Sequence, residues 1–228
     1  MRFDVILADP PWFYSNRVQH GEGPATKFGG GASGEYPLMC DADIIALGDL
    51  VKAVSAEQSV LFLWGTFPRF PLALEVMESW GFHYSTVAFQ WIKVNSKNGE
   101  PFRGPGKISS SNAEPLLVGW RGKSLLPVVG AMQSQIVEWP FETEDIWEPH
   151  PRWPVDTPPD PVSGKRRASK IIHSAKPGVF HERIAGVFGP VSRLELFARE
   201  HPGNWGTAIG NEITGNDIRE DLEALALL

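Results

Sequence analysis

The largely apolar run Phe3–Ala8 is followed directly by a carboxylate, two prolines and a tryptophan, at Asp9, Pro10, Pro11 and Trp12. Prolines fix the backbone φ angle and remove N–H donors. We therefore expect the local carbonyls and the carboxylate to face a cleft as hydrogen-bond acceptors, beside a flat aromatic ring. Such an array suits a planar base that carries an exocyclic amine, as adenine does. A tight turn after a core strand, with the tryptophan packed inside, is the structural alternative.

Other motifs that resemble known sites lack the context that those sites require. The run at 29–34, GGGASG, has the spacing G-x-G-x-x-G, but it follows no strand and opens no helix, so we interpret it as a loop or lid. The PPDP run at 158–161 is interpreted as loop for the same reason. The six histidines show no metal-ligand spacing, and no metal site is predicted.

Apolar runs alternate with helical patterns along the chain, which predicts an α/β fold with a mostly parallel sheet. In such sheets ligands bind beyond the carboxyl ends of the strands, where Asp9 lies. The predicted strands cover Phe3–Ala8, 59–64, 84–94, 113–120, 134–139 and 192–199, and the predicted helices cover 43–54, 69–82, 178–188 and 216–228.

Composition indicates a globular protein with a sizeable core. The 228 residues are 42% hydrophobic and 21% charged, so we predict one domain over residues 1–228. A single cysteine favours a reducing compartment, and no membrane span or signal-peptide pattern appears, so a cytoplasmic location is expected. The net charge of −6 argues against binding duplex DNA through overall charge, so any nucleic-acid contact should be local.

Residues 139–170 interrupt the pattern with many prolines and tryptophans, and we predict an irregular insertion loop there. Its end is basic, because no acid occurs between residues 161 and 176. Two interpretations stay open, a solvated flexible loop and an arm that contacts phosphates. The basic residues are Lys165, Arg166, Arg167, Lys170 and Lys176.

Several motifs together resemble the MT-A70 family of adenine N6-methyltransferases. They are DPPW at 9–12, the block at 61–95, NAEPLLVGWRGK at 112–123, HSAKP at 173–177, RLELFAR at 193–199 and GNE at 210–212. The resemblance implies a Rossmann-like domain with permuted motif order, S-adenosylmethionine as cofactor and adenine in nucleic acid as substrate. The small size resembles bacterial or phage DNA methyltransferases. RNA is the alternative substrate, and a non-catalytic nucleic-acid-binding partner is the alternative function.

The resemblance also implies roles by position. Asp9 and the Pro10 carbonyl are expected to accept hydrogen bonds from the adenine amine within the catalytic motif Asp9–Trp12, and Trp12 to stack on a base that is flipped or single-stranded. Asp9 also approaches the cofactor's amino group, and Lys176 pairs with its carboxylate. The remaining cofactor residues are Glu195, Arg199, His201, Asn211 and Glu212, and the substrate residues are Asn112, Glu114, Lys165, Arg166 and Arg167.

Structural alternatives exist for the cofactor residues. Glu195 and Arg199 could form an ion pair with each other, and Lys176 could support the start of a helix. Pro202 follows His201 where some relatives carry a polar residue. We expect a monomer or a homodimer.

Overall fold

The computed structural model describes most of the chain. For residues 143–148 and 166–171 the description is limited to the backbone. The predictions for 29–34, 158–161 and Lys165 lie outside the described residues. The described ranges are 1–12, 39–96, 98–104, 108–123, 126–140, 143–148, 166–171 and 176–228.

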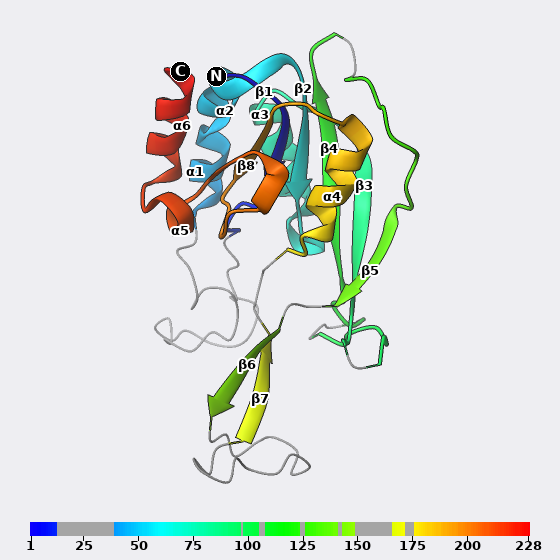
Figure 1. Ribbon diagram of the computed structural model, residues 1–228. Helices are drawn as coiled ribbons and strands as arrows, with labels where there is room; N and C mark the ends of the chain where they lie inside the picture. The colour runs from blue at the N-terminus through cyan, green and yellow to red at the C-terminus, as the bar shows by residue number, and fades with distance from the viewer. Residues whose placement is uncertain are drawn as a thin grey trace.

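A seven-stranded sheet forms the centre of the molecule, in the order β5-β3-β4-β2-β1-β8-β9 (Figure 1). The neighbouring pairs are parallel except at β4, which runs antiparallel to both β2 and β3. The predicted α/β architecture with a mostly parallel sheet is thus confirmed. The strands are β1 Phe3–Ala8, β2 Ser55–Trp64, β3 His83–Val94, β4 Ala113–Arg121, β5 Ile136–Pro140, β8 Arg193–Leu196 and β9 Thr207–Ile209.

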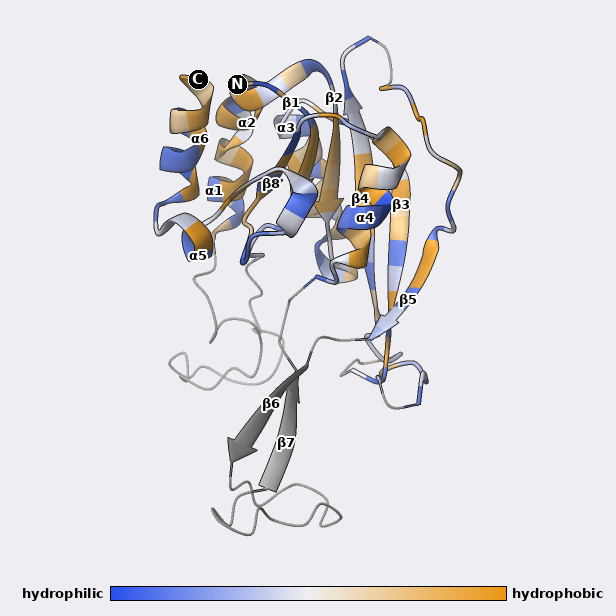
Figure 2. Ribbon diagram, viewed as in Figure 1, coloured by the Kyte–Doolittle hydropathy of each residue, from blue (hydrophilic) through white to orange (hydrophobic). Residues whose placement is uncertain are grey.

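Successive side chains of a strand point to opposite faces of the sheet, so that the apolar strands present side chains to both faces. Helices cover both of these faces. On β1, Ile6 packs in a core with α1, α2, α3 and α6, whereas Val5 and Leu7 pack in a second core with α4. Figure 2 shows hydrophobic residues concentrated on the central strands. The helices are α1 Asp41–Ala46, α2 Gly48–Val54, α3 Phe70–Ser79, α4 Val179–Phe188, α5 Asn211–Thr214 and α6 Ile218–Ala226.

The predicted helix over 43–54 is in fact two helices, α1 and α2, separated at Leu47. Close packing explains why a glycine follows the break. A Cβ atom on Gly48 would lie 2.5 Å from the carbonyl oxygen of Ser79, at the end of α3. A larger residue at this position would therefore collide with the end of α3.

The prediction of an irregular loop over 139–170 is wrong in part. Trp139 and Pro140 end β5, and β6 Thr143–Glu148 pairs with β7 Arg166–Ile171 in an antiparallel two-stranded sheet. The register places Glu148 opposite Arg166 and Glu144 opposite Lys170, so acidic positions face the basic segment. Figure 1 shows this hairpin on the side of the sheet toward which β5 points.

The carboxyl ends of β1, β2, β8 and β9 meet at one edge of the sheet, because these four strands run in the same direction. Asp9 follows β1 and Phe197 follows β8 at this edge. In the described ranges, no helix has the length and apolar character needed to cross a membrane. The edge formed by these strand ends is where the chemistry-bearing residues converge.

Candidate active site

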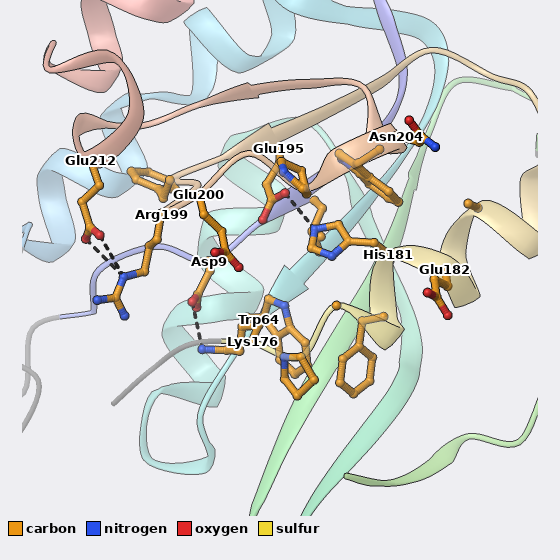
Figure 3. A pocket seen from close by; sticks show the side chains of 18 residues that line it. Asp9, Trp64, Lys176, His181, Glu182, Glu195, Arg199, Glu200, Asn204 and Glu212 are labelled. Atoms are coloured by element: carbon orange, nitrogen blue, oxygen red, sulfur yellow. Dashed lines mark hydrogen bonds and ion pairs between the residues drawn. The ribbon is translucent and has the colours of Figure 1, made fainter. Parts of the chain in front are cut away.

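Two cavities meet at the carboxyl edge of the sheet. The larger has a volume of about 630 Å³ and lies between β1, β8 and α4 (Figure 3). The smaller, about 320 Å³, lies beside α5 and α6. Both volumes are typical of sites for small molecules. Four residues line both cavities, namely Asp9, Phe197, Arg199 and Glu212.

The position of Asp9 follows from the alternation of side chains along β1. Leu7 faces α4, and Asp9 lies two residues further along on the same side. The Asp9 side chain is 24% exposed, and its Oδ2 atom accepts a hydrogen bond from Lys176 Nζ at 2.8 Å. The carboxylate therefore lines the cavity and also has a protein partner, which the sequence did not indicate.

Asp9 is the last member of a row of alternating charges. Lys93 on β3 donates to Glu114 on β4, and Glu114 Oε2 lies 3.5 Å from Lys176 Nζ. These side chains are mostly buried, so each charge depends on its neighbours. The row thus runs from β3 and β4 to Lys176 and Asp9, which line the larger cavity.

Burial and charge act differently on the two acids. Burial raises the pKa of Asp9 above its usual range, and Lys176 offsets this only in part. Burial also acts to raise the pKa of Glu114, but Lys176 and Lys93 together outweigh it and lower the pKa. The pKa values of these two neighbouring acids are thus shifted in opposite directions. Such divergent acids often mark a functional site.

Trp12 and Pro10 were predicted to face the cleft, but both are buried. The Trp12 side chain is 4% exposed, and its Nε1 atom donates to the Trp64 carbonyl oxygen at 3.1 Å. Pro10 is buried as well, and its carbonyl oxygen accepts the Trp12 backbone N–H at 2.8 Å. The indole needs a partner for its N–H group, and the core supplies one. Pro11 does line the smaller cavity.

Three of the predicted cofactor residues, Glu195, Arg199 and Glu212, take part in two separate pairs. Glu195 pairs with His181 at 2.8 Å, and Arg199 Nε donates to both carboxylate oxygens of Glu212, at 3.1 and 3.2 Å. The structure thus does not show the ion pair between Glu195 and Arg199 considered from the sequence. Asn211 lines the smaller cavity and donates to the Asn216 carbonyl oxygen at 3.3 Å.

The other predicted site residues lie further from the two cavities. His201 is exposed and does not line either of them. The carbonyl oxygen of half-buried Asn112 accepts the Lys93 backbone N–H at 2.8 Å, just before β4. Arg166 and Arg167 begin β7, and their contact with phosphates stays a prediction.

Lys93, His181 and Phe197 are among the residues at or beside the site that were not identified from the sequence. Lys93 lies within the family-like block at 61–95, but only the pairing of β3 with β4 shows that it meets Glu114. His181 lies in the first turn of α4. Phe197 lines both cavities with φ 63°, a conformation that is uncommon outside glycine and that clusters at functional sites.

The larger cavity has an excess of negative charge, which restricts the ligands that it can hold. Its carboxylates exceed its lysine and arginine side chains, so a ligand with positive charge and hydrogen-bond donors fits it best. The cations are Lys176 and Arg199, and the acids are Asp9, Glu182, Glu195, Glu200 and Glu212.

Comparison with known proteins agrees with this geometry. The MT-A70 family model matches residues 3–142, which include Asp9 and Glu114. The type II methyltransferase M.MunI from Mycoplasma sp is 28% identical over 95% of this chain and 80% of its own length. A probable N(6)-adenosine-methyltransferase MT-A70-like protein from Oryza sativa subsp. japonica is 26% identical over 94% of this chain, which spans 23% of that protein. The motif order, the α/β sheet and the match over more than half of the sequence lead to one conclusion: the chain belongs to the MT-A70 family.

Proposed function

We propose that this protein transfers a methyl group from S-adenosylmethionine to the N6 amine of adenine in DNA. The observation that carries the proposal is the position of Asp9, a partly exposed carboxylate that lines both cavities. Lys176 holds its Oδ2 atom, and the 24% of the side chain that stays exposed is available to a substrate donor.

The charge of the larger cavity fits the cofactor. When bound, S-adenosylmethionine supplies an electrophilic methyl group on a positively charged sulfur. The carboxylates around the cavity favour that charge, and Lys176 offers a cation for the carboxylate of the methionine part. Glu195 and Glu212 are the proposed acceptors for its hydroxyl and amine donors, and Arg199 is a proposed donor to its oxygen atoms. Asn211 lies on the side proposed for its adenine.

Asp9 acts in this proposal as an acceptor for the target amine. The nitrogen of adenine is a weak nucleophile, because its lone pair is delocalised into the ring. A hydrogen bond to Asp9 fixes the amine and favours a pyramidal nitrogen, so correct approach supplies much of the rate increase. Lys176 fixes the carboxylate in turn. The amine loses its proton after the methyl group has been transferred, so a strong general base is not required.

Glu114 is the proposed second contact with the target base. It stays ionised because Lys93 and Lys176 lower its pKa, and Lys176 links it to Asp9. No stacking role is assigned to Trp12, whose side chain lies in the core. A base in a duplex must be flipped out, or arrive single-stranded, to reach these residues.

DNA is proposed as the substrate because of the resemblance to small bacterial and phage DNA methyltransferases. The relative named a type II methyltransferase is of similar size, since this chain covers 80% of it, whereas it covers 23% of the rice relative. The basic segment from Lys165 through Arg167 is the proposed phosphate contact. The net charge of the whole chain is −6, which disfavours DNA binding by the rest of the surface. Because binding then depends on this basic segment, the affinity for DNA should fall as the salt concentration rises.

Methyl transfer to matched DNA and RNA oligonucleotides tests the proposal. Each pair carries the same mixed sequence, and labelled S-adenosylmethionine is the methyl donor. We expect the DNA to be methylated at least about tenfold faster, and Asp9→Ala to reduce transfer to the level of a blank. Faster transfer to RNA would reassign the substrate. Equal labelling by the wild type and by Asp9→Ala would refute methyl transfer at this site.

A further inference from the structure

A second carboxylate of the larger cavity, Glu195, is held by a residue with no assigned role. Leu194 and Leu196 pack on the face of the sheet that carries α1, α2 and α6, so Glu195 points to the α4 face. Leu7 is its register partner on β1, and Asp9 lies two residues beyond Leu7 on the same face. Asp9 and Glu195 thus line one side of one cavity.

His181 in the first turn of α4 engages one oxygen of this carboxylate. His181 Nε2 lies 2.8 Å from Glu195 Oε2, and the two side chains are 17% and 16% exposed (Figure 3). An ionised carboxylate only accepts hydrogen bonds, so Nε2 carries the hydrogen and donates it. Charge-assisted hydrogen bonds of this kind are short and directional.

The imidazole ring is itself fixed from behind. It packs edge to face against Trp205, with ring centroids 4.9 Å apart and an interplanar angle of 74°. Trp205 is 3% exposed, and the Cζ atom of the Arg193 guanidinium lies 5.5 Å from the centroid of its ring. His181 therefore stands between a buried aromatic wall and the carboxylate, with little freedom to turn away.

Within the part of the chain that the structure describes, His181 is the one side chain that bonds to Glu195. The second carboxylate oxygen remains available in the cavity. We propose that His181 is a positioning residue, which orients Glu195 so that this oxygen accepts a hydrogen bond from an O–H or N–H donor of the cofactor. This inference rests on the proposed function, because it requires the cofactor to occupy the larger cavity.

Two substitutions separate the hydrogen bond from the ring. His181→Phe keeps an aromatic ring against Trp205 and removes the donor, whereas His181→Gln keeps a donor at a similar reach and removes the ring. S-adenosylhomocysteine binding is measured by calorimetry for both variants and the wild type. We expect about tenfold weaker binding for His181→Phe and less than about threefold for His181→Gln, as for the loss or retention of one charge-assisted hydrogen bond.

Methylthioadenosine, which keeps the ribose but lacks the amino-acid part, identifies the donor group. Loss of affinity for both ligands assigns a ribose hydroxyl, and loss for S-adenosylhomocysteine alone assigns the ammonium group; either result supports the inference. In a Glu195→Gln background, His181→Phe should weaken binding little further, because the carboxylate it orients is gone.

The surface pair between His83 and Glu78 provides a matched control. His83→Phe breaks a similar contact, 3.3 Å long, at a side chain that is 81% exposed, and should leave binding unchanged. Unchanged binding in His181→Phe, or equal loss in His181→Phe and His181→Gln, overturns the inference while leaving the proposed function intact. A wild-type protein that binds neither ligand overturns both.

Discussion

The two cavities that meet at Asp9 hold their charges in different ways. In the larger cavity, Lys176 and Asp9 are 15% and 24% exposed, and the row of charges continues to Glu114 and Lys93. In the smaller cavity, Arg219 and Asp43 pair at 2.8 Å with exposures of 39% and 50%. Arg199 and Glu212, which line both cavities, are intermediate at 28% and 36%.

This difference in burial distinguishes the part of the site that is proposed to carry out methyl transfer from the part that is proposed only to bind a ligand. Charges in a medium of low polarity interact strongly and shift each other's pKa, as Asp9 and Glu114 show. Charges near the surface are screened and contribute little to stability. We therefore expect substitutions in the buried row to have large effects, and substitutions in the exposed pairs to have small ones.

The largest effect is expected for Asp9→Asn. Loss of the negative charge, and replacement of one acceptor oxygen by an NH2 donor, should lower the methyl-transfer rate by about 1,000-fold, as for the loss of one positioned polar group. The same substitution should not lower the stability of the folded protein. Because burial raises the Asp9 pKa above its ordinary value of 3.8, ionised Asp9 costs stability as the pH rises through the folded-state pKa. An asparagine stays neutral, so Asp9→Asn should melt no lower than the wild type at neutral pH, and the difference should vanish near pH 4. A variant that melts well below the wild type at neutral pH would contradict this sign.

Lys176→Met should have the next largest effect. Removing one partner from a buried ion pair is expected to lower the free energy of unfolding by about 3 kcal/mol. It also removes the charge that opposes the rise in the Asp9 pKa, so the fall in activity toward low pH should begin at a higher pH than in the wild type. Rate profiles at saturating cofactor check this shift. An unchanged or lower pH for that fall would show that Asp9 does not control it.

Glu212→Gln should have the smallest effect. Its carboxylate is 36% exposed, so solvent screening reduces what its pair with Arg199 contributes, and we expect a change in unfolding free energy below about 1 kcal/mol. Urea denaturation compares this variant with Lys176→Met. Equal losses in the two variants would remove the distinction between the buried and the exposed pairs.

The residues that the sequence located correctly are those fixed by local rules. Apolar β1 must be buried, ligands collect beyond the carboxyl ends of parallel strands, and Asp9 follows β1 directly. The α/β architecture follows from the same alternation of patterns. The family resemblance predicted cofactor roles for five residues that line one or both cavities, and these roles stay predictions. The residues are Lys176, Glu195, Arg199, Asn211 and Glu212.

The features that were not predicted depend on contacts between distant segments. Trp12 turns inward because the Trp64 carbonyl, 52 residues away, accepts its indole N–H. Asp9 is paired because Lys176 arrives from a segment 167 residues away. Neither contact can be predicted from the local sequence pattern. The β6–β7 hairpin was missed because its strands are short and lie among prolines, which favour a loop interpretation.

The position of the transferred methyl group tests the central claim most directly. A DNA oligonucleotide is incubated with wild-type protein and labelled S-adenosylmethionine, digested to nucleosides and analysed by mass spectrometry, with Asp9→Asn in parallel. We predict N6-methyladenine from the wild type and none above background from the variant. A methyl group on cytosine or on a ring nitrogen of adenine, or equal N6-methyladenine from both proteins, would contradict the role given to Asp9.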